Sequence, residues 1–76
     1  MKSTSFQERI GLAMKKRREE LDLTQENLAP LANMHRNRYG EIERGLIRIR
    51  IDTLEKLSLA LNMRPWEILK EAETIQ

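Results

Sequence analysis

Apolar residues recur along this chain at the three- and four-residue spacing of an α-helix, in short runs that each end at a turn-forming residue. Runs of this kind predict short amphipathic helices. Alternation of apolar and polar residues, which is typical of a half-buried strand, occurs only over residues 46–51. A single short strand has no partner run with which to pair. The pattern therefore predicts an all-α fold, with residues 46–51 as a loop.

Capping and terminating residues set the boundaries of the helices. Ser5 followed by Glu8 has the spacing of a capping box, and Thr24 suits an N-cap whose hydroxyl accepts from an amide two or three residues on. Gly45 suits the residue just after a helix, and Pro65 suits a first helical turn. We predict helices over about 6–21, 25–32, 36–44, 52–61 and 65–73.

Several positions predict local irregularities. Asp52 followed by Glu55 predicts a second capping box with Asp52 as the N-cap. Pro30 lies inside the second helix, where it removes a backbone donor and predicts a bend or an early end. Asn33 tolerates a left-handed backbone and predicts a tight turn. The first helix is expected to bury a stripe made of Phe6, Ile10, Ala13, Met14 and Leu21. Arg17 interrupts this stripe, and it either lays its methylene stem across the core edge or leaves the packing thin there.

The chain has 76 residues and no cysteine, so it predicts one domain over residues 1–76 that is held together by apolar burial. The absence of cysteine excludes disulfides, thiolate nucleophiles and cysteine-based zinc fingers. The sequence has neither a run long enough to cross a bilayer nor a signal-like N-terminus, and we expect a cytoplasmic protein without a membrane partner. A chain of this size buries only about 60% of its unfolded surface, which favours a homodimer.

Charge is unevenly distributed along the chain. The formal net charge is only +2, but residues 35–51 carry five arginines and two glutamates. The flanking segments have nearly balanced or acidic compositions. A basic segment inside a folded domain indicates a surface that faces a polyanion, although an ordinary solvated face is the alternative.

Two short helices joined by a tight turn, the second beginning with Arg and Asn, have the arrangement of a helix-turn-helix. The chain resembles the lambda-repressor-like helix-turn-helix family in its residues 23–29 (LTQENLA), 33–36 (NMHR), 41–45 (EIERG), 54–57 (LEKL) and 60–61 (AL). Within that family the chain is most similar to the controller proteins of restriction–modification systems. The resemblance implies a five-helix domain with the motif at about 24–44. It also implies a symmetric dimer on a pseudo-palindromic operator, with the second motif helix in the major groove of double-stranded DNA.

The start of the expected recognition helix carries the side chains that suit base edges. Arg pairs with guanine and Asn with adenine, each good bidentate contact contributing about 1–3 kcal/mol of discrimination. The expected base-reading residues are Gln25, His35, Arg36, Asn37 and Arg38. The expected phosphate-contacting residues are Thr24, Tyr39, Arg44, Arg48 and Arg50.

Two positions in the expected recognition helix have more than one interpretation. Tyr39 is three residues from Ile42, which favours a place in the core over a phosphate contact. Gly40 is costly inside a helix, and either a close approach to DNA or a lack of selection explains it. The resemblance also implies that Arg18 pairs with Glu43 and braces the motif, so the basic run over residues 15–18 is interpreted mainly as structural.

The last two helices, about 52–73, are expected to dimerise. Their apolar stripe consists of Leu61, Met63, Trp66, Ile68 and Leu69. One alternative function is an antitoxin of this fold, which would use the same stripe to bind a toxin protein and would also bind its own promoter. A phage or plasmid repressor is the other alternative. The chain has one histidine and no carboxylates at a cooperating spacing, so we expect no enzyme, metal, cofactor or small-molecule ligand. Few aromatic residues make RNA binding a weaker alternative.

Overall fold

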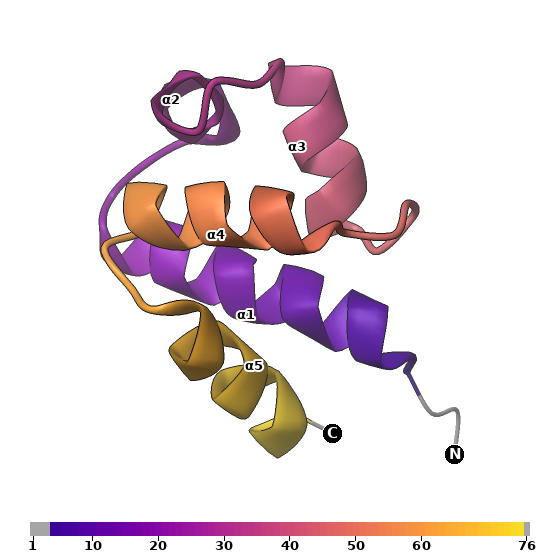
Figure 1. Ribbon diagram of the computed structural model, residues 1–76. Helices are drawn as coiled ribbons and strands as arrows, with labels where there is room; N and C mark the ends of the chain where they lie inside the picture. The colour runs from indigo at the N-terminus through magenta and orange to yellow at the C-terminus, as the bar shows by residue number, and fades with distance from the viewer. Residues whose placement is uncertain (1–3, 76) are drawn as a thin grey trace.

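The computed structural model describes residues 4–75, and within that range it contains helices and no strand (Figure 1). The helices are α1 (Phe6–Glu20), α2 (Gln25–Leu31), α3 (Arg36–Glu43), α4 (Ile51–Ala60) and α5 (Pro65–Thr74). The all-α, five-helix prediction is confirmed, and every predicted boundary lies within one residue of the observed one. None of these helices is long and apolar enough to cross a bilayer.

The first two helices begin at the predicted caps. The Ser5 hydroxyl accepts from the Glu8 amide at 3.1 Å, and the Glu8 carboxylate accepts from the Ser5 amide at 3.0 Å. At α2 the Thr24 hydroxyl accepts from the Asn27 amide at 3.0 Å, while the Asn27 side chain accepts from the Thr24 amide. Side chains therefore satisfy backbone donors that the first turn of each helix leaves unpaired.

The capping box predicted at Asp52 is wrong. Helix α4 begins one residue earlier, at Ile51, and its N-cap is Arg50, which makes no side-chain capping bond. Asp52 instead lies in the first turn, where its carboxylate accepts from Arg50 Nε at 3.2 Å and from the Thr53 amide at 3.0 Å. A carboxylate in this turn is stabilised by the positive end of the helix dipole, which explains the acidic residue without a cap. The hydrogen bond from Arg50 lowers the pKa of Asp52 below its usual value.

Four of the helices end in the same way, with a residue in the left-handed conformation. At the end of α4, for example, the Asn62 amide donates to Leu59 O at 3.0 Å and the Met63 amide donates to Ser58 O at 2.8 Å, which is a Schellman motif. The left-handed residues are Asp22 (φ 57°), Asn33 (φ 55°), Gly45 (φ 74°) and Asn62 (φ 56°). The predicted turns at Asn33 and Gly45 are confirmed, and α2 ends one residue after Pro30.

The core lies where α1, α3, α4 and α5 meet, with α2 packed on α3 and α4. Its buried side chains are Ile10, Ala13, Met14, Leu28, Ala29, Ala32, Tyr39, Ile42, Leu54, Leu57, Leu61, Ile68 and Ala72. Phe6, expected on the core stripe, is 39% exposed, because it starts α1 beyond the core and its ring lies against the Arg9 guanidinium.

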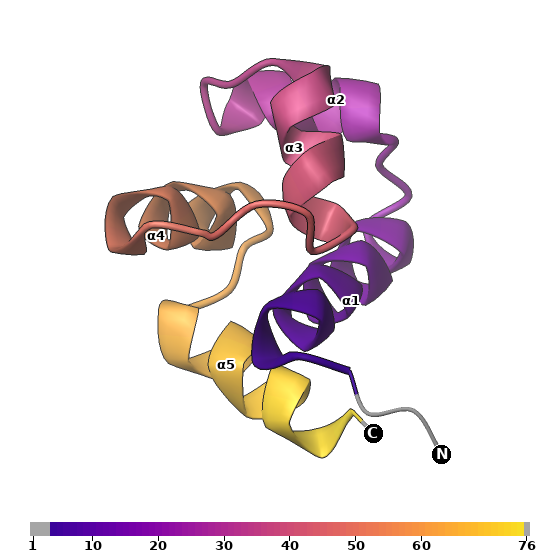
Figure 2. The same ribbon diagram turned by 90° about the vertical axis from the view of Figure 1, so that its right-hand side faces the viewer.

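The crossing of α1 and α3 is unusually close. A methyl group added to Gly11 would collide with the carbonyl oxygen of Glu43, so only glycine lets the two backbones approach to this distance. This contact fixes the C-terminal end of α3 against the middle of α1. Figure 2 shows the result: α3 faces the viewer in the upper half of the molecule, with α2 behind it and α1 beneath its lower end.

Replacing Asn62 with alanine should destabilise the protein, because a left-handed backbone costs a residue with an ordinary side chain about 1 kcal/mol. For a domain of this size that corresponds to a fall in Tm of about 4–8 °C. Asn62→Gly should be at least as stable as the natural chain, since glycine has no Cβ penalty. Thermal denaturation followed by circular dichroism measures both. An alanine variant that melts with the natural chain would contradict the argument.

Candidate nucleic-acid interface

A buried ion pair connects α1 to the end of α3. Arg18 Nε and Nη2 donate to the two carboxylate oxygens of Glu43, each at 2.9 Å, in a bidentate arrangement. The Arg18 and Glu43 side chains are only 11% and 4% exposed. The third nitrogen of Arg18 donates to the carbonyl of Leu23 at 2.8 Å, in the loop that leads to α2. The pairing that the family resemblance implies for Arg18 and Glu43 is therefore confirmed.

Two further side chains donate to the Glu43 carboxylate. Gln25 Nε2, at the start of α2, donates to it at 3.0 Å, and the Tyr39 hydroxyl donates to it from one turn earlier in α3. Burial raises the pKa of Glu43, but the hydrogen bonds from Arg18, Tyr39 and Gln25 lower it by more. The carboxylate consequently stays ionised below its usual range, and it connects α1, α2 and α3 through one side chain.

Tyr39 is a core residue. Its side chain is fully buried, and its hydroxyl is occupied by Glu43. Burial, together with that hydrogen bond, raises the pKa of the phenol above its usual value. The core interpretation is confirmed, and the phosphate contact assigned to Tyr39 is wrong because neither ring nor hydroxyl reaches the surface.

Gly40 is explained by α2 rather than by DNA. It is buried, and a methyl group on it would lie 3.3 Å from the side-chain oxygen of Gln25. The missing side chain leaves the room in which Gln25 crosses from α2 to reach Glu43. Gln25 is thereby half-buried, with one end of its amide committed to Glu43 and the rest at the surface.

The exposed side of α3 forms a shallow hollow of about 250 Å³ with the start of α2. We call it the α3 face, and it is lined by Gln25, Arg36, Asn37, Gly40, Glu41 and Arg44. It brings together four of the predicted DNA-contacting residues. The hollow is polar, and its charged side chains are three-to-five residues apart on one side of the helix, which is the geometry of a surface that enters a groove.

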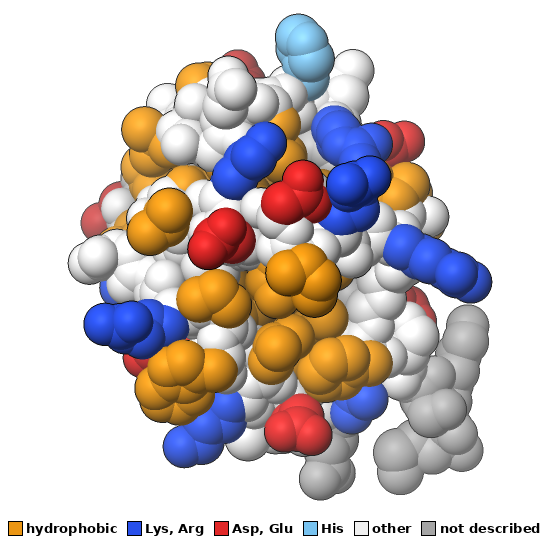
Figure 3. Space-filling model, viewed as in Figure 1, with side chains coloured by type: hydrophobic (Ala, Val, Ile, Leu, Met, Phe, Trp, Pro, Cys, Tyr) orange, Lys and Arg blue, Asp and Glu red, His pale blue; other side chains and the backbone are white. Residues whose placement is uncertain are grey.

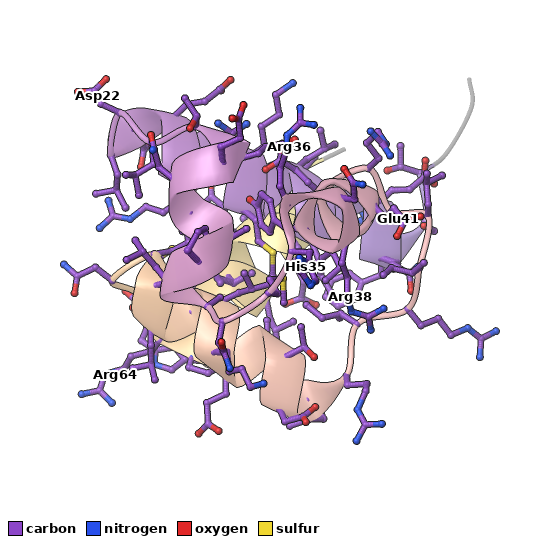
Figure 4. The ribbon with its side chains drawn as sticks, turned by 90° about the horizontal axis from the view of Figure 1, so that it is seen from above. Asp22, His35, Arg36, Arg38, Glu41 and Arg64 are labelled. Atoms are coloured by element: carbon purple, nitrogen blue, oxygen red, sulfur yellow. The ribbon has the colours of Figure 1, made fainter. Side chains whose placement is uncertain are left out.

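His35 and Arg38 lie outside this hollow. Both are exposed, His35 as the N-cap of α3 without a side-chain capping bond. Figure 4 looks along α3 and shows Arg36 and Arg38 leaving the helix on opposite sides. Arg38 therefore flanks the α3 face, and the predicted base-reading residues that lie within it are Gln25, Arg36 and Asn37.

Glu41 is a residue of the α3 face that the sequence analysis missed. It follows Asn37 by four residues and precedes Arg44 by three, so all three share one side of the helix. That spacing was available from the sequence. The charge of the basic segment indicates only its arginines. The helical spacing also indicates Glu41, because an exposed carboxylate on the same side of the helix can contact a ligand as well.

The other predicted phosphate contacts are exposed but dispersed. Thr24 uses its hydroxyl to cap α2, and Arg44 lines the α3 face. Arg48 and Arg50 lie in the loop between α3 and α4, with Arg50 hydrogen-bonded to Asp52. The structure therefore groups only Arg44 with the base-reading residues.

Three of the four basic residues at 15–18 make contacts within the protein. Lys16 pairs with Glu71 of α5 at 2.6 Å, half-buried Arg17 donates to Leu61 O at 3.0 Å, and Arg18 holds Glu43. Lys15 differs, because it is exposed and lines a hollow of about 390 Å³ with Gln25 and Arg44. The structural interpretation holds for three residues, and Lys15 extends the positive border of the α3 face.

The surface expected for dimerisation has a different composition in the structure. Leu61 and Ile68 are fully buried in the core of the single chain, so assigning them to a dimer interface is wrong. Both face inward because α4 and α5 pack on each other along that side. Trp66 is 59% exposed, and Met63 and Leu69 are half-buried.

Within the described residues, no three histidine, aspartate or glutamate side chains gather at a distance that would hold a metal ion. Most of the side chains that line the α3 face are hydrogen-bond donors or carry positive charge.

The model of the family described as "Helix-turn-helix" matches residues 14–69, from the second half of α1 to the middle of α5. The chain belongs to the helix-turn-helix family. Helices α2 and α3 both lie within the matched range.

The relatives are control proteins. Control protein C.MunI from a Mycoplasma species is 35% identical over 66 residues, which is 86% of this chain and 89% of that protein. Control protein C.BamHI from Bacillus amyloliquefaciens is 38% identical over 48 residues, 63% of this chain and 59% of that protein. Among solved structures, the restriction-modification controller protein C.AhdI from Aeromonas hydrophila has a TM-score of 0.78 at 31% identity, covering 80% of this chain and 92% of that one. The resemblance inferred from the motif is confirmed.

Glu43→Gln keeps the shape of the side chain and removes its charge, which leaves Arg18 buried without a counter-ion. We expect a loss of about 3 kcal/mol in the free energy of unfolding at pH 7. The pKa of Glu43 is lower in the folded state than its ordinary value of 4.5, so its contribution is present above that value and is lost as pH falls through the folded pKa.

The natural chain should therefore lose stability more steeply than the Gln variant as the pH falls below about 4.5. Urea denaturation at a series of pH values from 3 to 7 measures both slopes. Glu55→Gln, an exposed carboxylate on α4, is the control and should leave the natural slope unchanged. Equal slopes for the natural chain and Glu43→Gln would show that Glu43 does not govern acid unfolding.

Proposed function

We propose that this chain is a transcriptional regulator of the controller type, which binds a pseudo-palindromic site in double-stranded DNA as a homodimer. The observation that carries the proposal is the α3 face, where exposed base-reading side chains lie on a helix that a buried network holds from behind. The similarity to two control proteins and to a restriction-modification controller protein supports the biological role. Such a regulator works by binding, in the cytoplasm where the DNA lies, and needs no catalytic group.

In this proposal α3 lies in the major groove with the α3 face toward the bases. Arg36 suits the two acceptors of guanine, and Asn37 suits the acceptor and donor of adenine. Gln25 reaches the groove from the start of α2, with its orientation fixed by Glu43. His35 and Arg38 flank these contacts on neighbouring positions.

Positive side chains on both sides of the α3 face would contact the sugar-phosphate backbone. Lys15 and Arg44 border the face next to α1, and Arg48 lies in the loop after α3. Thr24 contributes its exposed hydroxyl, whose oxygen caps α2 while its proton can be donated to a phosphate oxygen. These phosphate contacts position the protein on the DNA and make its affinity depend on salt, whereas Arg36 and Asn37 determine which DNA sequence it prefers.

The proposed dimer interface is an apolar surface of α4 and α5. Figure 3 shows hydrophobic side chains gathered on the side of the molecule where these two helices lie. We call this surface the C-terminal patch, and it consists of Ile51, Leu59, Met63, Trp66 and Leu69. Ile51 and Leu59 are 82% and 75% exposed. Large exposed apolar side chains grouped in this way indicate an association surface, and a second copy of the chain is the partner that a pseudo-palindromic site requires.

Selection from a library of random duplex DNA, at near-physiological salt, tests the proposed function directly. We expect enrichment of an inverted repeat with half-sites about one helical turn apart. Binding that vanishes as salt rises, without any enriched sequence, would contradict sequence-specific recognition.

Arg36→Ala and Arg48→Ala should separate base reading from phosphate contact. Arg36→Ala should cost about 1–3 kcal/mol on the selected operator and relax the preference at one base pair. Arg48→Ala should weaken all sequences alike and reduce the salt slope by about 0.9 per protomer. Dissociation constants for the operator and its single-base variants, at several salt concentrations, measure both effects. Lys70→Ala removes a positive charge from α5 as the control, and a change of base preference in Arg48→Ala would contradict the assignment.

Leu59→Glu should dissociate the dimer, because it would bury an unpaired charge in the interface formed by the C-terminal patch. Sedimentation equilibrium should give the monomer mass at concentrations where the natural chain is dimeric, and operator affinity should fall with it. Leu31→Glu, which charges an equally apolar residue that is 63% exposed on α2, is the control for the oligomeric state and should remain dimeric. A dimeric Leu59→Glu would place the interface elsewhere.

A further inference from the structure

The α3 face contains one acidic residue among donors and positive charges. Glu41 is exposed, lines the hollow with Arg36, Asn37 and Arg44, and leaves α3 on the side away from α2 (Figure 4). It therefore occupies the part of the helix that would point most directly into a groove.

No contact within the protein accounts for Glu41. Its carboxylate makes no hydrogen bond or ion pair with another residue in the described range 4–75, and it takes no part in capping α3. The other glutamate of this helix, Glu43, is buried and fully occupied. A carboxylate on a surface that faces phosphate opposes binding unless it meets a donor.

The donors available in a major groove are few. Guanine presents two acceptors and thymine presents an acceptor and a methyl group, so both repel a carboxylate. Adenine presents an amino donor beside the N7 acceptor, which would lie against the second carboxylate oxygen. Cytosine presents its N4 amino group with no acceptor beside it in the groove, and it is the base that a carboxylate matches.

We infer that Glu41 reads a cytosine, accepting a hydrogen bond from its N4 amino group at one fixed position of each half-site. The inference rests on the proposed function, since it specifies which base one further residue of the α3 face selects. The carboxylate also excludes other sequences, because at every other base its charge faces an acceptor or a methyl group. Glu41 is thus a specificity-determining residue whose negative charge lowers the affinity for DNA in general.

The test uses the full chain and the operator that the natural protein enriches from random duplex DNA. Binding is measured for natural protein, Glu41→Ala and Glu41→Gln on duplexes in which each base pair in turn is replaced by the other three. The natural protein should prefer C at one position per half-site by about 5- to 150-fold. Glu41→Ala should lose this preference and keep the others, while binding random duplex DNA more tightly. Glu41→Gln, whose amide donates and accepts, should shift the preference at that position toward A.

Glu20→Gln is the matched control, because it makes the same change at an exposed carboxylate at the end of α1, away from the α3 face, and it should change no base preference. A Glu41→Ala variant that keeps every base preference of the natural protein would overturn the inference while leaving the proposed function intact. Loss of preference at a guanine instead would also overturn it, since Glu41 would then act by orienting an arginine. Failure of the natural protein to enrich any operator would be a failure of the proposed function itself.

Discussion

The Glu43 carboxylate, paired with Arg18 beneath the surface, is the interaction on which the rest of this structure depends. It receives hydrogen bonds from α1, α2 and α3, and Arg18 extends the network to the carbonyl that precedes α2. A buried charge pair is not in itself strong evidence of stability, because desolvation offsets much of the attraction between its members. What it provides here is direction: planar guanidinium and carboxylate groups meet in one geometry, and the two motif helices can satisfy it in only one relative orientation.

That orientation matters because α2 is only seven residues long and contains a proline near its end. A helix so short has little stability of its own and takes its position from its neighbours. Gln25 ties its first residue to Glu43, and Gly40 leaves the space through which Gln25 passes. Gly11 lets α1 approach the end of α3 closely enough for Arg18 to reach Glu43. Two glycines and one ion pair therefore determine where the side chains of the α3 face point, although all four of these residues are buried.

The sequence predicts much of this arrangement, and the limits of the prediction have physical causes. Helix boundaries follow from local signals, namely caps, left-handed turns and apolar spacing, and all five are correct to one residue. The Arg18–Glu43 pair came from the family pattern, since nothing local to two residues 25 positions apart reveals their contact. Leu61 and Ile68 were misassigned to the surface because an apolar stripe does not show which of its members the neighbouring helix covers. Glu41 was missed for a different reason: net charge identified the basic segment, whereas the spacing from Asn37 to Arg44 identifies the residues that share its exposed side.

The C-terminal helices show how a chain of this size meets two demands at once. One side of α4 and α5 supplies core residues such as Leu57 and Ile68, whereas the other side leaves Ile51, Leu59 and Trp66 exposed. A single domain with so small a core gains stability when the exposed side is covered by a second copy. In the proposed dimer, the same association would set the distance and symmetry between two α3 faces, each of which offers only a few side chains for base contacts. In the proposed mechanism, folding stability and operator selection are therefore linked through one surface, because the dimer that covers the C-terminal patch is also the form that can hold both half-sites together.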